Sequence, residues 1–165
     1  MIYLEPVSIE QEQTLHNIMQ FYIYEFSQYI PTIKLEDNGS YKPFNLEQYW
    51  KNEHLHAFFI KVDSELIGFA LVECGLNEPH SINEFFVMKK YAGKGYGGMA
   101  AKELFSMFEG SWKITQIQNN YPAQAFWRKV INQYTNGDYK EYYDENHRSI
   151  QEFRSKSMDG HSKLI

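Results

Sequence analysis

The sequence is poor in several features that mark particular classes of protein. It has one cysteine, Cys74, which excludes an internal disulfide and a zinc site built from several cysteines. We expect Cys74 to be a small buried residue rather than a nucleophile. No run of about 18 apolar residues is present, so we expect no membrane-spanning helix and no membrane partner. The first residues lack a basic flank followed by an apolar stretch, which predicts no signal peptide and a cytoplasmic protein.

Positive charge is also scarce. The chain has 16 lysine and arginine residues against 21 aspartate and glutamate residues, and its formal net charge is −5. Since binding to a phosphate backbone depends on positive charge, we expect no nucleic-acid partner and a weak preference for cationic ones. Because 43% of the residues are hydrophobic, general disorder is excluded. What is plentiful is aromatic side chains, at 17% of the 165 residues.

The length suits one domain, and no linker interrupts the chain. Apolar alternation predicts strands over residues 3–5, 57–62, 66–72, 80–88, 112–118, 138–143 and 148–153. Helical spacing and capping signals predict helices over residues 8–29, 45–50 and 122–134, and another from a glycine-rich loop to about residue 108. This order predicts a mixed α/β sheet with helices on its faces, because strands and helices do not alternate regularly.

The most informative segment is the glycine-rich loop over residues 93–98, which joins a predicted strand to a predicted helix. Glycine lets the backbone approach a ligand closely, and the N–H groups at a helix start bind anions. Lys89, Lys90 and Lys94 add positive charge. The segment therefore predicts a phosphate or pyrophosphate site, and the alternative is a turn that merely connects two elements.

Gly93, Gly95 and Gly98 also form the glycine pattern of dinucleotide-binding crossovers. Several elements precede this loop, however, and little chain follows it. The acidic residue that such a site needs about 20 positions later is missing from residues 113–118. A nicotinamide-dinucleotide-binding oxidoreductase is therefore kept only as a further alternative.

Two motifs taken together resemble the GNAT superfamily of acetyl-CoA-dependent N-acetyltransferases. In that family a strand leads to a glycine motif at a helix start, and a later helix carries Asn, Ala, Phe and an aromatic residue at fixed spacing. Residues 92–97 and 120–127 are similar to these motifs. The strand over residues 82–88 is similar to that of spermidine/spermine acetyltransferases. Residues 105–112 and 126–131 resemble a bacterial group of predicted acetyltransferases, which matches more of the chain.

The resemblance implies a GNAT-type fold, with a mixed, mostly antiparallel sheet and helices on both faces. It implies a single domain over residues 1–154, followed by a polar tail over residues 155–165. It also implies acetyl-CoA as the acetyl donor, no metal, and a primary amine of a small molecule or a protein as the acceptor. A homodimer is one expectation for its assembly.

The same resemblance assigns roles to the residues that bind acetyl-CoA. The backbone of residues 85–87 pairs with the pantetheine arm, residues 93–98 hold the pyrophosphate, and Asn120 contacts the far end of the arm. The Val87 N–H stabilises the oxyanion of the tetrahedral intermediate. The implied cofactor-binding residues are Phe85, Phe86, Val87, Met88, Ala92, Gly93, Lys94, Gly95, Tyr96, Gly97, Gly98, Asn120, Ala123 and Trp127.

Two positions depart from the family pattern. The family usually has Arg or Gln where this chain has Ala92, so one phosphate contact is expected to be weaker unless Lys94 or Lys90 compensates. Many members use a Tyr at the position of Trp127 as the general acid. An indole N–H cannot deliver a proton near neutral pH. Tyr121 and Tyr134 are nearby substitutes, and we take Tyr134 as the candidate acid.

The base and the acceptor site are less well marked. Where polyamine acetyltransferases have a catalytic Glu, this chain has Asn83, so the neighbouring Glu84 is the candidate base. The alternative for Glu84 is an ion pair with a lysine or arginine at the sheet edge. Helix aromatics such as Tyr22 and Phe26 are expected in the core. Aromatic residues near the chain breaks are candidates for substrate binding, with acidic neighbours suited to a cation: Tyr29, Tyr41 and Phe44, with Glu25, Glu36 and Asp37.

The sequence therefore predicts an N-acetyltransferase that moves an acetyl group to a primary amine by direct attack through a tetrahedral intermediate. The alternative is a catalytically weak or inactive acyl-CoA-binding sensor, in keeping with Ala92, Asn83 and Trp127.

Overall fold

The computed structural model describes residues 1–157, which fall into two compact units. The first unit comprises Met1–Val72 and Asn83–Lys94, and the second comprises Glu73–Ile82 and the chain from Gly95 onward. The expectation of a single domain over residues 1–154 stays a prediction. Residues 158–165 of the expected tail lie outside the described residues, and Ser155, its first residue, is buried in the last strand.

The first unit is built around a four-stranded sheet with the order β1-β2-β3-β4. Its strands are β1 (Ile2–Pro6), β2 (Leu55–Val62), β3 (Glu65–Glu73) and β4 (Ser81–Val87). β1 pairs antiparallel with β2. Asp63 and Ser64, both with positive φ, form the two-residue turn between β2 and β3, which confirms the predicted hairpin.

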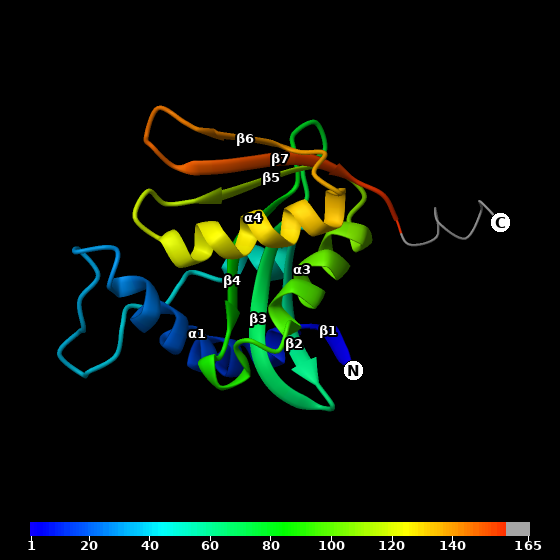
Figure 1. The fold of residues 1–165 in the computed structure, drawn as a ribbon. Helices are drawn as coiled ribbons and strands as arrows, with labels where there is room; N and C mark the ends of the chain where they lie inside the picture. The colour runs from blue at the N-terminus through cyan, green and yellow to red at the C-terminus, as the bar shows by residue number, and fades with distance from the viewer. Residues whose placement is uncertain (158–165) are drawn as a thin grey trace. The chain divides into compact units, whose positions relative to one another are not determined.

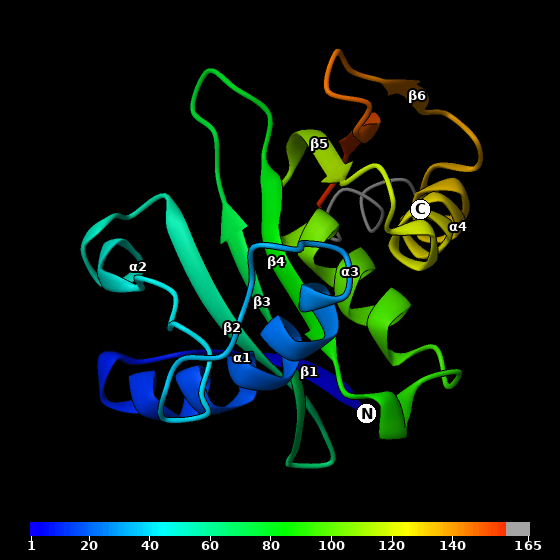
Figure 2. The same ribbon diagram turned by 90° about the vertical axis from the view of Figure 1, so that its left-hand side faces the viewer.

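Helix α1 (Glu12–Ser27) packs on this sheet (Figure 2). Leu15, Ile18 and Met19 are buried on one side of α1, as helical spacing predicts, and pack with Phe59 and Phe69 of the strands. A short 3-10 helix, η1 (Ile9–Gln11), precedes α1. The short helix α2 (Glu47–Lys51) and the 3-10 helix η2 (Lys89–Tyr91) complete the unit. Helix α1 ends two residues before the predicted end.

The second unit pairs two helices with a three-stranded sheet (Figure 1). Its elements are α3 (Tyr96–Met107), β5 (Gly110–Gln116), α4 (Tyr121–Thr135), β6 (Lys140–Tyr143) and β7 (Ser149–Ser155). The strand order is β5-β7-β6, and both neighbouring pairs are antiparallel. The core between helices and sheet is aromatic. The centroid of the Phe105 ring lies 5.1 Å from that of Trp112 and 4.8 Å from that of Phe153.

The structure confirms the predicted α/β class, with antiparallel sheets and flanking helices, and the predicted order of elements. The strands of the described residues divide between two sheets instead of forming one. Among residues 1–157, no helix combines the length and apolar character needed to cross a membrane.

Candidate functional site

The glycine-rich loop ends at the start of α3 in a conformation suited to an anion. Gly95 is the N-cap residue and has a φ of 81°, a left-handed conformation that favours glycine. The first bond of the helix runs from the Met99 N–H to the Gly95 carbonyl oxygen, 3.0 Å away. The N–H groups of residues 96–98 therefore have no partner inside the helix, and they form a binding site for a negative group.

The three lysines around this loop differ in their partners. Lys89 forms an ion pair with Glu25 on α1, with 3.1 Å between the charged atoms, and Lys90 lies 3.7 Å from Glu65. Lys94 has no ion pair within the described residues; a hydrogen bond from Tyr91, then Lys90 and to a smaller extent the Lys94 charge lower the pKa of Glu65. Of the two lysines expected to compensate for Ala92, Lys94 is therefore the one whose charge remains available.

Strand β4 carries Phe85, Phe86 and Val87 at one end of the four-stranded sheet order. Its position leaves one backbone edge without a neighbour in that sheet, which is the arrangement that strand-like addition of a ligand requires. On its other side β4 lies very close to Gly68 of β3, because a Cβ atom at Gly68 would stand 2.0 Å from the Phe86 carbonyl oxygen.

Glu84 is paired, but not as the sequence alternative supposed. The Tyr22 hydroxyl of α1 donates a hydrogen bond to Glu84 Oε2. The expected ion pair with a lysine or arginine is wrong, because the partner is a neutral phenol. Burial raises the pKa of Glu84, and the hydrogen bond from Tyr22 offsets part of that rise. Burial, followed by the Glu84 charge, raises the pKa of Tyr22.

A pocket of about 450 Å³ lies between α1 and the segment over residues 32–44 in the first unit. Two of the three predicted substrate-binding residues, Tyr41 and Phe44, line it, and Tyr29 does not. Of the three acidic residues expected there, Glu36 lines the pocket. Glu25 forms its ion pair with Lys89 instead. The lining residues are Tyr22, Ile23, Phe26, Thr32, Ile33, Lys34, Glu36, Tyr41, Lys42, Pro43 and Phe44.

The wall of this pocket is fixed to α1 by one side chain. Gln20 Nε2 donates to the Tyr41 carbonyl oxygen at 3.0 Å, and Gln20 Oε1 accepts from the Tyr41 N–H at 2.8 Å. These two bonds give the breaker-rich segment a defined position over the helix. Sequence reasoning missed the roles of Gln20 and Tyr22, because their partners are many residues away. It also missed Lys34 and Lys42, which line the pocket and belong to no motif.

In the second unit, the predicted cofactor residues Asn120 and Ala123 open α4. Asn120 Oδ1 accepts from the Ala123 N–H at 3.1 Å and caps the helix, which leaves its amide NH₂ as the group suited to a ligand. Gln124 Nε2 donates to the carbonyl oxygens of Ile117 and Gln118, at 2.9 Å each, and so fixes the loop before α4. Trp127 is buried, with its ring 6.3 Å from Phe105.

Tyr134, the candidate acid, lies at the other end of α4. Its hydroxyl is 3.1 Å from Ser106 Oγ, and its ring contacts Phe105 and Phe153. A helix rises about 1.5 Å per residue, so Tyr134 is roughly 10 Å along α4 from Trp127, the position whose family tyrosine it was expected to replace, and farther from the Asn120 end of the helix. Tyr134 as the general acid stays a prediction. Tyr121, which is 70% exposed in the first turn, remains near that end.

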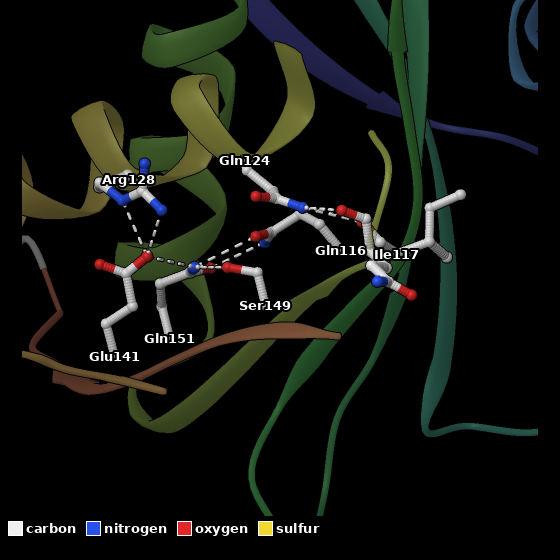
Figure 3. A network of polar contacts seen from close by, with 8 residues as sticks. Gln116, Ile117, Gln124, Arg128, Glu141, Ser149 and Gln151 are labelled. Carbon is white, nitrogen blue, oxygen red and sulfur yellow. Dashed lines mark hydrogen bonds and ion pairs between the residues drawn. The ribbon is translucent and has the colours of Figure 1, made fainter. Parts of the chain in front are cut away.

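A buried polar network lies between α4 and the sheet of the second unit (Figure 3). Gln116 and Gln151 exchange two amide hydrogen bonds, at 2.7 and 3.1 Å, and Gln151 also donates to Ser149 Oγ at 3.0 Å. The network reaches Glu141, which forms an ion pair with Arg128 of α4 at 2.7 Å. Its buried members are neutral, so it stabilises packing rather than proton transfer.

The remaining reactive side chain is Cys74, which is half-buried. Burial, with a contribution from the Glu73 charge, raises the pKa of its thiol to about 11, so it is neutral near pH 7. A neutral thiol is a weak nucleophile, and Cys74 is less buried than expected. Within residues 1–157, no group of three or more His, Cys, Asp or Glu side chains is arranged to hold a metal ion.

Comparison with known proteins yields one family and many similar structures. The family model described as acetyltransferase (GNAT) family matches residues 17–131, more than half of the chain. No curated protein matches.

Solved structures with the same fold come from several organisms. The PaiA N-acetyltransferase from Thermoplasma acidophilum in complex with coenzyme A has a TM-score of 0.64 at 16% identity, over 93% of this chain and 99% of that one. An acetyltransferase from Thermus thermophilus has a TM-score of 0.63 at 17% identity, over 93% and 97%. The ribosomal-protein-S18-alanine N-acetyltransferase from Escherichia coli has a TM-score of 0.61 at 13% identity, over 94% and 95%. At these identities the likeness shows the fold alone.

Proposed function

Because this chain belongs to the acetyltransferase (GNAT) family, we propose that it transfers an acetyl group from acetyl-CoA to a primary amine. The reaction is direct attack of the amine on the thioester, through a tetrahedral intermediate. The observation that carries the proposal is the start of α3, where a left-handed Gly95 precedes three N–H groups that have no helical partners and suit an anion. The coenzyme A complex of PaiA supports coenzyme A as the source of that anion.

The backbone edge of β4 and Lys94 have complementary parts in this proposal. The edge of residues 85–87 receives the pantetheine arm, and the Val87 N–H points at the developing oxyanion. Lys94 supplies the phosphate contact that Ala92 lacks, since Lys89 and Lys90 already have carboxylate partners. The leaving thiol has a pKa near about 8.5, so it leaves partly as thiolate and needs only weak help from an acid.

The acceptor is an amine with an apolar or aromatic body. Four aromatic rings line the pocket, and its charged groups are Lys34 and Lys42 against Glu36 alone. Neither lysine has an ion pair in the described part of the chain, so a polyamine meets more repulsion than attraction. The overall negative charge suggested only a weak preference for cationic partners, and the pocket narrows that preference to amines with a single charge.

The cofactor is tested first by a thermal melt with acetyl-CoA, CoA and NADH in parallel. A ligand at 100 times its Kd stabilises the folded state by about 2.7 kcal/mol, which moves the midpoint measurably. We expect a shift with both CoA species and none with NADH. Absence of a CoA shift would overturn the proposal, and a shift without CoA release on any amine would favour the sensor.

A glycine pair provides the matched test of the loop. Gly95→Val forces a β-branched residue into positive φ, although nothing lies within 4 Å of the added Cβ atom. Gly39 has a φ of 82° and equally open surroundings, so Gly39→Val imposes the same backbone strain elsewhere. We expect at least a tenfold loss of CoA affinity in the first variant only. Equal affinities in two folded variants would contradict the assignment of the loop.

The acceptor class is tested by CoA release on a panel of amines. Tyramine and phenethylamine represent the aromatic class, putrescine and spermidine the polycations, and a short lysine peptide the protein amines. We expect kcat/KM to be highest for the aromatic amines. A preference for spermidine would overturn the acceptor class and leave the acetyltransferase proposal intact.

A further inference from the structure

One half-buried contact in the first unit joins a strand of the predicted cofactor site to the acceptor pocket. Tyr22 on α1 donates its hydroxyl hydrogen to Glu84 Oε2 on β4, and α1 packs on the sheet that contains β4 (Figure 2). The two residues are 62 positions apart in the sequence. The contact therefore depends on the fold and could not have been inferred from either segment alone.

The two partners differ in their access to the pocket. Tyr22 is one of its lining residues, and Glu84 is not. The phenol therefore links the pocket wall to the carboxylate, because its hydroxyl is bonded to Glu84. We expect an acceptor amine in this pocket to meet Tyr22 before Glu84, which sequence reasoning assigned as its base.

The surroundings of the pair are apolar. The Tyr22 ring lies 5.5 Å from Phe69 in an edge-on contact, 6.0 Å from Phe86 and 5.7 Å from Phe26, measured between ring centroids. Phe44 of the pocket wall is 6.4 Å away. Four rings from α1, β3, β4 and the pocket wall thus surround the phenol, and they hold it in one orientation.

The elements that pack around the pair carry further charged and titratable groups. On α1, Glu25 is neutralised by Lys89, which follows β4. On β4, the neighbouring Asn83 is an amide whose Nδ2 lies 3.2 Å from the Tyr49 hydroxyl of α2. The ring neighbours on β3 and β4 are phenylalanines. The pocket wall contributes the titratable groups Lys34, Glu36, Tyr41 and Lys42.

We propose, on the basis of the proposed function, that Tyr22 and Glu84 form a two-step relay that removes a proton from the acceptor amine. The ammonium N–H bond breaks and its proton passes to the Tyr22 oxygen, while the Tyr22 O–H proton passes to Glu84 Oε2. The freed nitrogen lone pair forms the bond to the thioester carbonyl carbon.

The remaining steps balance the reaction. The tetrahedral intermediate loses its second nitrogen proton to water, and the C–S bond breaks with its electron pair on the CoA sulfur. Glu84 then returns its proton to solvent, and Tyr22 ends each cycle unchanged. Tyr22 is the catalytic residue of the pair, and Glu84 acts through it.

The ionisation of the pair agrees with this role. Burial raises the pKa of Glu84 above the ordinary carboxyl value of about 4.3, so it is a stronger base than an exposed carboxylate. Burial and the Glu84 charge raise the pKa of Tyr22, so the phenol keeps a proton and passes one on rather than losing it to solvent.

The experiment compares Tyr22→Phe, Glu84→Gln and the double variant with the wild type. It uses the best amine of the panel and measures kcat, the KM for acetyl-CoA and the pH profile. General base catalysis is typically worth 10²–10⁴-fold, so each single variant should lose about 100-fold in kcat near pH 7. The double variant should lose no more, because both residues serve one relay. The CoA-induced melting shift should be retained.

The pH profile separates a relay from mere support of the fold. In the wild type, kcat falls at low pH as Glu84 becomes protonated, and Glu84→Gln should abolish that fall. The defect should shrink as the pH approaches about 10, where the amine is neutral without a base. Tyr49→Phe is the matched control, because it removes a phenol oxygen beside the neighbouring Asn83 and should leave kcat within about threefold.

Two results would overturn the relay. One is a Tyr22→Phe enzyme with kcat within about threefold of the wild type, and the other is a loss that stays constant up to pH 10. Wild-type transfer with either result refutes the relay alone. Failure of the wild type to release CoA on any amine refutes the relay together with the proposed function.

Discussion

The two units bury polar side chains in different ways. In the second unit, Gln116, Gln151 and Ser149 are neutral and satisfy one another beneath α4. In the first unit, the corresponding pair is a half-buried carboxylate and phenol, Glu84 and Tyr22, among aromatic rings. Neutral amides neither gain nor lose a proton near pH 7. The Glu84 carboxylate can accept one, and the Tyr22 hydroxyl that is bonded to it carries one. The comparison separates a buried network that stabilises packing from one suited to chemistry.

The largest effect is expected from breaking the neutral network. Gln151→Leu leaves the Gln116 amide and the Ser149 hydroxyl without their partner, and each unsatisfied buried group costs roughly 1–3 kcal/mol. We expect the free energy of unfolding to fall by about 2–3 kcal/mol in urea denaturation, with no change in the pH dependence of kcat.

The paired replacement sharpens this prediction. With Gln116→Leu added to Gln151→Leu, no amide is left unpaired, and the double variant should be more stable than the two single losses imply. Additive losses would mean that the amides stabilise the unit separately, and that the network is not one cooperative group.

A smaller effect, on CoA affinity, is expected from removing single lysine charges in the first unit. Lys94→Gln should weaken CoA binding about fivefold, roughly 1 kcal/mol, because its ammonium group has no carboxylate partner in the described residues. Lys90→Gln is the control, since Lys90 is paired with Glu65. Calorimetric titration with CoA at two salt concentrations measures both. Equal losses of CoA affinity in the two variants would show that Lys90 contributes to CoA binding despite its ion pair with Glu65.

Glu84→Gln should leave stability largely intact at neutral pH, in contrast to Gln151→Leu. The folded-state pKa of Glu84 is raised above its unfolded value of about 4.3. Its cost to stability is therefore absent below that value and grows as pH rises through the folded pKa. The variant should lose this dependence, which melting temperatures between pH 4 and pH 8 would show. If the melting temperature of the variant depended more steeply on pH than that of the wild type, the pKa of Glu84 would not be raised by folding.

The smallest effect concerns the one thiol of the second unit. With its pKa raised to about 11, Cys74 should react slowly with iodoacetamide at pH 7 and faster as pH rises toward 11. Alkylation rates across that range, compared with a free thiol, test this expectation. Rapid labelling at pH 7 would mean that the thiol is partly ionised there. The second unit would then also contain a side chain that titrates near neutral pH, which contradicts the difference drawn between the units.

Local signals in the sequence were sufficient for most of the fold. The Asp63 and Ser64 turn, the Pro122 start of α4 and the glycines before α3 each determine an element from neighbouring residues. The first helix was predicted two residues too long, because helical spacing continues past Ser27 although the helix does not.

The site could be predicted only where its residues are adjacent in the chain. The loop over residues 93–98 is such a segment. Tyr22, in contrast, was expected in the core, and its ring does pack there, but its hydroxyl meets a carboxylate 62 positions away. Tyr134 was assigned by nearness in sequence, which could not show that its hydroxyl lies beside Ser106 of α3 near the last turn of α4.

Gly68 has a consequence for the evolution of this chain. Its missing side chain admits the Phe86 carbonyl group, and the smallest possible replacement, alanine, would place a carbon atom 2.0 Å from that oxygen. The obstacle is backbone, which no change of rotamer can relieve. Every missense change at this codon therefore displaces the strand that carries residues 85–87. In a mutational library selected for activity, position 68 should be among the least variable. Over evolution, substitutions should accumulate at other positions while Gly68 is kept.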